Sequence, residues 1–219
     1  MTASTNTIAV LTGDLVASTD LGAARIARAF EALERCAERQ RRWHGAPLHF
    51  TRQSGDGWQA VLARPELSLR SALAFRAALR ALGSAYDGYM AVIEGPGPDP
   101  ATIGTDLNAQ TGGLFVESGH ALDAMKTSRA GTRLLHETDG HSGPVAAAFA
   151  LADHISQGWT PPQAAAFLPM LDPDRPDFTT VAEALGKSRQ AVSKALYSAG
   201  LGAVTVALTA LESPKDPAR

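Results

Sequence analysis

The sequence predicts an α+β fold, in which a small sheet with its helices comes first and an all-helical segment follows. Short apolar runs alternate with long amphipathic stretches up to about residue 126. The stretch 138–144 is rich in Gly, Ser, His and Asp, as linkers between domains are. Beyond it the apolar spacing is almost wholly helical. We therefore expect one domain over residues 1–140 and a second over 145–213.

The elements of the first domain follow in order from these patterns. A continuous apolar run predicts a buried strand, capping residues open the next helix, and a Ser-Gly-Asp-Gly sequence between two apolar runs predicts a hairpin. The strands are expected at 8–11, 48–53, 58–62 and 89–94, and the helices at 21–44, 65–82 and within 112–125. We expect an exposed loop at 95–100. The order βαββαβ predicts a ferredoxin-like domain, whose antiparallel sheet carries its helices on one face.

The second domain contains a pattern typical of DNA-binding proteins. Helices are expected at 145–157, 161–170 and 203–211, and residues 176–201 read as a helix, a turn at Gly186 and a second helix opened by Ser188. This is the arrangement of a helix-turn-helix, whose second helix enters the major groove of DNA. Its apolar positions are Val181, Leu185, Val192 and Leu196. The side chains expected to reach phosphates or base edges are Lys187, Ser188, Arg189, Gln190, Ser193, Lys194 and Tyr197.

The charge of this segment bears on how it would bind. Residues 144–219 contain seven acidic and six basic side chains, and the whole chain has a net charge of −2. Because duplex affinity rests largely on phosphate neutralisation, a near-neutral domain binds weakly as a monomer. We therefore expect a homodimer that matches a palindromic double-stranded site. The alternative is that the helix-turn-helix shape serves packing or contact with another protein.

Composition excludes several classes of protein. The chain is 45% apolar and 19% charged, which indicates a globular protein. The single Cys36 excludes an internal disulfide and a cysteine-based zinc site, and no two histidines have zinc-ligand spacing on one helix. No secretory signal and no apolar run long enough to cross a bilayer is visible. We expect a cytoplasmic protein with no membrane partner.

Two aspartates of the first domain form a candidate ligand site. Asp14 ends the first strand and Asp56 lies in the hairpin turn, so the predicted sheet makes them neighbours. Paired carboxylates suit Mg²⁺. A nucleotide phosphate is expected against the backbone of Gly55 and the helix start at Ala17, Ser18 and Thr19. The alternative is that both aspartates are ordinary turn residues, which hydrogen-bond their own backbone.

Here the sequence resembles a known family. The segments LTGDLVAST and SGDGWQAVL resemble the paired motifs of class III nucleotide cyclases, and still more those of the SatD family, whose fold is cyclase-like or palm-like. The run TGGLFVESGHALDAMK resembles the SatD-type helix segment, so the likeness covers about residues 8–126. The whole layout resembles proteobacterial proteins that join a SatD-like domain to a helix-turn-helix. The resemblance implies that Asp14 and Asp56 bind metal. Cyclases also need an Asn and an Arg on the late helix, where this chain has Glu117 and Ala121.

Three functions follow as hypotheses. The first is a dimeric DNA-binding transcriptional regulator, whose first domain dimerises or senses a nucleotide or metal. The second is a Mg²⁺-dependent nucleotidyl-transfer or cyclase-type enzyme acting on a nucleoside triphosphate. The third is an adaptor that binds neither DNA nor nucleotide. We favour regulation over catalysis because an active site without a guanidinium clamp loses transition-state stabilisation.

Overall fold

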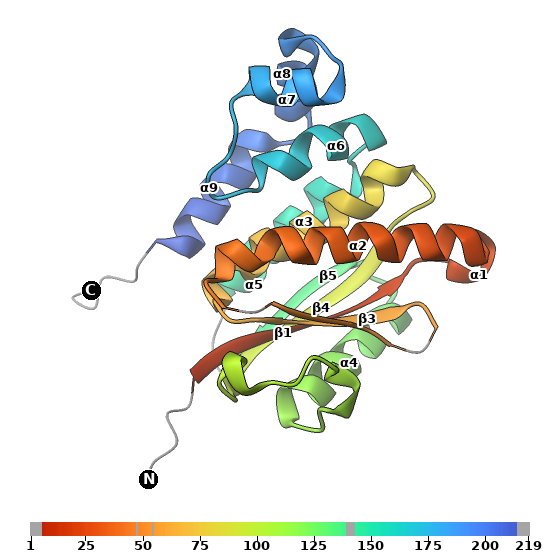
Figure 1. Ribbon diagram of the computed structural model, residues 1–219, viewed down its shortest axis with the longest axis vertical. Helices are drawn as coiled ribbons and strands as arrows, with labels where there is room; N and C mark the ends of the chain where they lie inside the picture. The colour runs from red at the N-terminus through yellow and green to blue at the C-terminus, as the bar shows by residue number, and fades with distance from the viewer. Residues whose placement is uncertain (1–5, 47, 54, 139–142, 214–219) are drawn as a thin grey trace.

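A computed structural model describes residues 6–46, 48–53, 55–138 and 143–213. It confirms the α+β class, since a five-stranded sheet lies between helices on its two faces and further helices follow at the C-terminal side (Figure 1). The predicted boundary at 138–144 falls mostly on residues 139–142, which lie outside the described residues, as does Ser54 of the predicted hairpin turn.

The sheet has the strand order β2-β3-β1-β4-β5, with β1 at its centre. The pairs β2–β3, β3–β1 and β1–β4 are antiparallel, whereas β4 and β5 are parallel. The elements of this half are β1 (Asn6–Leu15), α1 (Ser18–Leu21), α2 (Ala23–His44), β2 (His49–Arg52), β3 (Gly57–Leu62), η1 (Pro65–Leu67), α3 (Ser68–Leu82), β4 (Gly88–Gly97), η2 (Pro100–Thr102), η3 (Leu107–Ala109), α4 (Gly113–Thr127) and β5 (Leu134–Thr138).

The prediction that all helices cover one face of the sheet is wrong. Helices α2 and α3 lie on one face and α4 lies on the other (Figure 1). The reason is that β1 is apolar on both sides of its pleat: Ala9 and Leu11 join the core beneath α2 and α3, while Ile8 and Val10 join the core beneath α4. A strand buried on both faces needs a layer of helices on each.

One strand extends into a predicted loop, and another strand was not predicted. Strand β4 continues through residues 95–97, which the glycines and prolines there had marked as loop. Strand β5 was missed because it has only five residues, of which Leu134 and His136 are buried. It pairs with β4 in the register Met90↔Leu134, more than 40 residues away in the sequence, so the local sequence gives little indication of a strand.

The C-terminal helices are built on α3. They are α5 (Gly143–Gln157), α6 (Pro161–Met170), α7 (Phe178–Leu185), α8 (Arg189–Ser198) and α9 (Leu201–Glu212). Helices α5 and α6 pack against α3, and one hydrophobic cluster runs from Leu11 in the sheet through Phe149 to Leu208. Trp159 stacks on Phe167 with ring centroids 4.4 Å apart. The core therefore continues from the sheet into the helical segment.

Within the described residues, no single helix has both the length and the apolar composition to cross a bilayer. Helices α8 and α9 meet the length and composition criteria only when counted together, and the angle between them is 66°.

Candidate functional site

The two predicted carboxylates meet at one end of the sheet. Asp14 of β1 faces Gly57 of β3 in the antiparallel register, and Asp56 directly precedes Gly57. The backbone N–H of Leu15 donates to the carbonyl oxygen of Asp56 over 3.3 Å, which holds the hairpin turn against the end of β1. The two carboxyl groups are close enough for each to shift the pKa of the other. The predicted juxtaposition of Asp14 and Asp56 is therefore present.

Close packing around a buried tryptophan fixes this end of the sheet. The indole of Trp58 is fully buried and lies directly against Gly13. A Cβ atom at Gly13 would stand 2.3 Å from Cε2 of Trp58, and one at Gly88 would stand 2.8 Å from Cη2. Such distances are far below van der Waals contact, so both β1 at position 13 and β4 at position 88 need glycine. In the Gly13-Asp14 sequence, the glycine is needed for packing and the aspartate is a candidate site residue.

The loop after β1 brings a hydroxyl to the pair. The nearby Ser18 side chain lowers the pKa of Asp56. Ala17 has φ +50°, and it is the one residue other than glycine with positive φ in the described part of the chain. This left-handed conformation costs roughly 1–2 kcal/mol in an L-residue. Thr19 and Gly55 are exposed beside the site. The predicted phosphate-contacting residues therefore lie in the segment that follows Asp14 and in the turn that contains Asp56.

A lysine that was not singled out from the sequence completes the cluster. Lys126, in the last turn of α4, forms an ion pair with Asp14 across 112 residues of sequence. The Asp14 side chain is 10% exposed and that of Lys126 is 38% exposed. A sequence signal for this contact was available in the helical spacing. Ser118, Leu122 and Lys126 follow one another at intervals of four, so they lie on the same face of the helix. We call Asp14, Ser18, Asp56 and Lys126 the carboxylate site.

The two carboxyl groups differ in acidity. Burial raises the pKa of Asp14 above its usual value, and the proximity of Asp56 raises it further against the opposing effect of Lys126. Burial alone would also raise the pKa of Asp56, but hydrogen bonds with Ser18 and Asp14 outweigh it and the net shift is downward. The pKa of Asp14 is therefore shifted upward and that of Asp56 downward, and the two groups titrate as a pair.

A buried polar cluster fixes α4 on the sheet beneath this site. The hydroxyl oxygens of Thr12 and Ser118 are 2.6 Å apart. The Nε2 of Gln59 donates to Thr12 Oγ1 over 2.9 Å and to the carbonyl oxygen of Phe115 over 3.2 Å. Buried polar groups need such partners, and the partners set the register of the helix on the strands. This register places Lys126 over Asp14.

The donor set does not fit Mg²⁺ as it stands. Two carboxylates with waters or substrate phosphates are enough for Mg²⁺ in principle. Here the ammonium group of Lys126 is paired with the carboxylate of Asp14, so a cation already neutralises that oxygen. Across the described ranges, no three His, Cys, Asp or Glu side chains gather as they would in an all-protein metal site. We therefore derive no chemistry through a metal.

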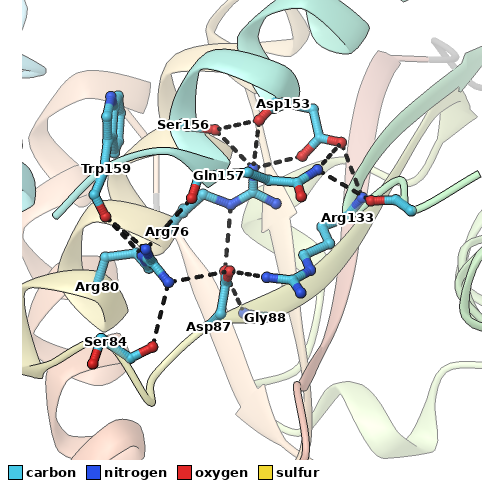
Figure 2. Close-up of polar contacts among 11 residues, drawn as sticks. Arg76, Arg80, Ser84, Asp87, Gly88, Arg133, Asp153, Ser156, Gln157 and Trp159 are labelled. Atoms are coloured by element: carbon cyan, nitrogen blue, oxygen red, sulfur yellow. Dashed lines mark hydrogen bonds and ion pairs between the residues drawn. The ribbon is translucent and has the colours of Figure 1, made fainter. Parts of the chain in front are cut away.

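An ion-pair network around Arg76 and Asp87 joins α3 to the C-terminal helices (Figure 2). The N–H of Val16 donates to the carbonyl of Asp87 over 3.0 Å, and the Asp87 carboxylate pairs with Arg76 and Arg80 at 3.6 and 3.7 Å. Fully buried Arg76 also donates to Asp153 of α5 over 2.6 Å. Asp87 therefore contacts the loop after β1 through its backbone and the α3–α5 junction through its side chain.

The same network continues to the end of α8. Arg80 donates to the carbonyl oxygen of Trp159 over 2.7 Å, as drawn in Figure 2. The indole N–H of Trp159 in turn donates to the carbonyl oxygen of Ala199, at the C-terminal cap of α8, over 2.8 Å. Trp159 itself is buried in the core.

The predicted turn between α7 and α8 is confirmed in its details. Asp177 caps α7 by accepting from the Thr180 N–H over 2.8 Å. Gly186 ends that helix with φ +61°, a conformation that glycine adopts without strain. The side chain of Ser188 caps α8 by accepting from the Ala191 N–H over 3.2 Å. The predicted apolar positions Val181, Val192 and Leu196 are buried, and Leu185 is half-buried.

The side chains predicted to contact DNA lie on the outside of α8 and its turn. Exposed among them are Lys187, Ser188, Arg189, Gln190, Lys194 and Tyr197, which we call the α8 surface, and Ser193 is half-buried. Tyr197 is 65% exposed while the edge of its ring packs on Phe178. Within the described residues, Lys187, Arg189 and Lys194 form no ion pair.

An open groove adjoins this surface. It runs between the start of α7, one side of α8 and the start of α9, with Arg175, Arg189 and Tyr197 among its lining residues. The groove adds a second guanidinium to the cations of the α8 surface.

No protein-family model matches the chain, and no curated protein matches its sequence.

Proposed function

We propose that this chain is a DNA-binding transcriptional regulator, in which α8 contacts double-stranded DNA and the sheet domain senses a ligand or mediates dimerisation. The single observation that supports this most is the α8 surface. Its polar and cationic side chains are exposed, and the cap of Ser188 fixes the N-terminal end of the helix that carries them. The N-terminal residues of a recognition helix are the ones that contact bases.

Two copies are needed for useful affinity. The net charge of −1 over residues 144–219 gives little general attraction to phosphates. A two-fold symmetric dimer presents the α8 surface twice, about one helical turn of DNA apart, and doubles the number of phosphate contacts. We place such a regulator in the cytoplasm, where bacterial DNA is.

The strand order of the sheet domain and the position of the carboxylate site support a sensing role. Strands β2-β3-β1-β4, with antiparallel neighbours and with α2 and α3 on one face, follow the order of a ferredoxin-like sheet. Strand β5 and helix α4 are additions to that plan. The carboxylate site lies at the end of the central strand, beside the loop that contains Ala17, Ser18 and Thr19, where a nucleotide phosphate would meet backbone N–H groups.

A gel-shift assay with genomic fragments tests DNA binding. The double variant Arg189→Ala, Lys194→Ala is expected to lose binding at least tenfold, because two phosphate or base contacts of roughly 1 kcal/mol or more each are removed. The matched control is Arg35→Ala, Arg41→Ala on α2, which removes two equally exposed cations far from α8. Equal binding by both double variants would reject α8 as the DNA-contacting helix.

A second function is favoured by the convergence of Asp14, Ser18 and Asp56. A Mg²⁺-dependent nucleotidyl-transfer or cyclase-type enzyme would use such a pair with a nucleoside triphosphate. On this alternative, incubation with each of the four common triphosphates and Mg²⁺ yields a product, and Asp14→Asn abolishes it. Absence of any product from the wild-type chain would leave the sensing role as the better account.

A thermal-shift screen separates sensing from an adaptor role. A nucleotide that binds the native state raises the unfolding midpoint, and the rise grows with the logarithm of its concentration above Kd. A sensor is expected to respond to at least one nucleotide, and Asp56→Asn should weaken the response. An adaptor that binds neither nucleotide nor DNA would respond to none of them.

A further inference from the structure

We propose that the groove between α7, α8 and α9 binds a small organic anion, in which a phosphate or carboxylate group is joined to an apolar body, and that this ligand competes with DNA for Arg189. The groove is lined by other residues than those of the carboxylate site. The inference deepens the proposed function, because it names a ligand class that would control the α8 surface. Only the competition with DNA rests on that function.

The groove has the dimensions of a small-molecule site. It is open to solvent, with a volume of about 710 Å³, and its walls come from the end of α6, the loop before α7, and parts of α7, α8 and α9. The corner between α8 and α9 is held in place, because the indole N–H of Trp159 donates to the carbonyl oxygen of Ala199 over 2.8 Å. Ligand sites are typically preformed clefts of about 300–1,000 Å³, so the groove is large enough for one organic ligand.

The charge of the lining favours an anion. Arg175 and Arg189 both line the groove, and within the described part of the chain neither forms an ion pair. The carboxylate of Asp177 also lines it, but this group caps α7 by accepting from the Thr180 N–H over 2.8 Å. Two guanidinium groups therefore face one carboxylate that is already engaged. Guanidinium groups bind phosphate and carboxylate oxygens in a bidentate manner, so an oxyanion is the complementary ligand group.

The apolar part of the lining favours a free ligand over a DNA phosphate. Met170 and Leu201 are buried, and Phe178 is half-buried with its ring centroid 6.1 Å from that of Tyr197. All four side chains line the groove beside the two arginines. The backbone of a duplex offers phosphates to such a surface but no apolar group, because its bases are stacked inside the helix. An organic anion offers both, and it gains free energy by covering the apolar side chains.

Arg189 belongs to the groove and to the α8 surface at the same time. It is the first residue of α8, at the end of the helix that is proposed to contact bases. Its guanidinium cannot hold the oxygens of the ligand and those of DNA together. A bound anion also places negative charge beside this end of α8, which repels the phosphates of DNA. The ligand and DNA therefore bind in competition, and each lowers the affinity for the other.

The binding experiment uses naphthyl phosphate as the probe, measured by isothermal titration to the full chain. Naphthol and inorganic phosphate each carry one half of its chemistry. Wild type is expected to bind one probe molecule at least about tenfold more tightly than either half. Arg175→Gln should weaken the probe at least about tenfold. Gly202→Leu should do the same by filling the groove from α9, at a position where an added Cβ meets nothing within 4 Å.

Two control variants make the same chemical changes elsewhere. Arg35→Gln removes an exposed arginine of α2, and Gly119→Leu adds a side chain at an open position of α4, so both should bind the probe as wild type does. Arg175 and Gly202 are both exposed, so their variants should fold, and either one alone decides the location of the site. Equal affinity of wild type for the probe and for naphthol overturns the proposal. Absence of probe binding in the millimolar range does so too, as do equal losses in the groove and control variants.

The gel shift with added probe tests the competition. At ten times its Kd, the probe should weaken DNA binding of wild type about tenfold and should have no effect on DNA binding of Arg175→Gln. Unchanged DNA affinity of wild type under these conditions overturns the competition. A chain that binds the probe but no DNA loses the proposed function and keeps the ligand site. A chain that binds DNA but not the probe keeps the function and loses the ligand site.

Discussion

The carboxylate site and the α8 surface use charge in opposite ways. At the carboxylate site the charges are partly buried and neutralised within the molecule, as in the pair of Asp14 with Lys126. On the α8 surface Lys187 and Lys194 are exposed, and inside the described ranges neither is engaged in an ion pair. Buried charges that lose a partner cost stability, whereas exposed ones cost almost nothing. The contrast therefore separates side chains that hold the fold from side chains free to meet a partner.

The largest effect is expected at Arg76, the most deeply buried member of the network. Arg76→Met leaves the buried carboxylate of Asp153 without its guanidinium partner, while Asp87 keeps Arg80 and Arg133, and the free energy of unfolding should fall by about 3–5 kcal/mol. Urea denaturation measures this as a lower midpoint at unchanged slope. Arg41→Met, which removes an exposed partner of Glu38, should cost about 0–1 kcal/mol. Similar losses in both variants would break the comparison.

The next effect extends the comparison to pH. His44 is buried, its Nε2 lies 3.1 Å from Ser71 Oγ, and its Nδ1 accepts from the Arg64 N–H. Burial lowers the pKa of His44 from 6.5 to about 4. Between these values the unfolded chain takes up a proton that the folded chain refuses, so stability falls as pH drops from about 6.5 to 4, by about 3 kcal/mol in total.

Urea midpoints across this pH range measure the loss. His44→Gln keeps a polar group and does not titrate, so its unfolding free energy should vary less with pH than that of wild type. The exposed His154 provides the control, since His154→Gln should leave the wild-type slope unchanged. If the unfolding free energy of His44→Gln depended on pH as strongly as that of wild type, another group would be responsible for the acid sensitivity.

A smaller effect concerns shape rather than charge. Gly13→Ala places a methyl group against the Trp58 indole, which has no room to move, and should cost about 1–3 kcal/mol. Gly119→Ala, in α4 with open space around the added carbon, should instead stabilise by up to about 1 kcal/mol, because alanine is the better helix former. Thermal unfolding of both variants gives the contrast in sign. Equal thermal midpoints of the two variants would show that the end of β1 can shift to make room for the methyl group.

The smallest effect is expected on α8 itself. Arg189→Ala and Lys194→Ala should each change the free energy of unfolding by no more than about 0.5 kcal/mol, since both side chains are exposed. Urea denaturation of the double variant measures this beside the gel shift. A loss of several kcal/mol would mean that these cations support the fold, and the DNA-binding result could then not be attributed to lost contacts.

Local patterns were sufficient for most elements of the fold. The helices around residues 21–44 and 65–82 follow from apolar spacing and their stop signals, and the turn at Gly186 follows from glycine and a capping serine. Strand β5 and the second helical layer were not predictable in this way. Both depend on β4 and β1 being buried on two sides, and the apolar runs alone did not show which elements would cover them.

The candidate sites show the same limit. Asp14 and Asp56 could be paired from sequence because a hairpin and a neighbouring strand fix their proximity. Lys126 and Arg76 find their partners 112 and 77 residues away, across helix packing that no local pattern records. Proximity fixed by strand pairing was therefore predictable from the sequence, whereas ion pairs made by helix packing were not.

The contact between Gly13 and Trp58 has a consequence for tracing the ancestry of this chain. Because Gly13 and Gly88 both lie against one indole, a side chain at either position is compatible only with a smaller residue at position 58. Changes at these three positions should occur together when kindred sequences are aligned. A glycine, glycine and tryptophan set at these spacings would then identify distant kin even where the acidic residues beside it have been replaced.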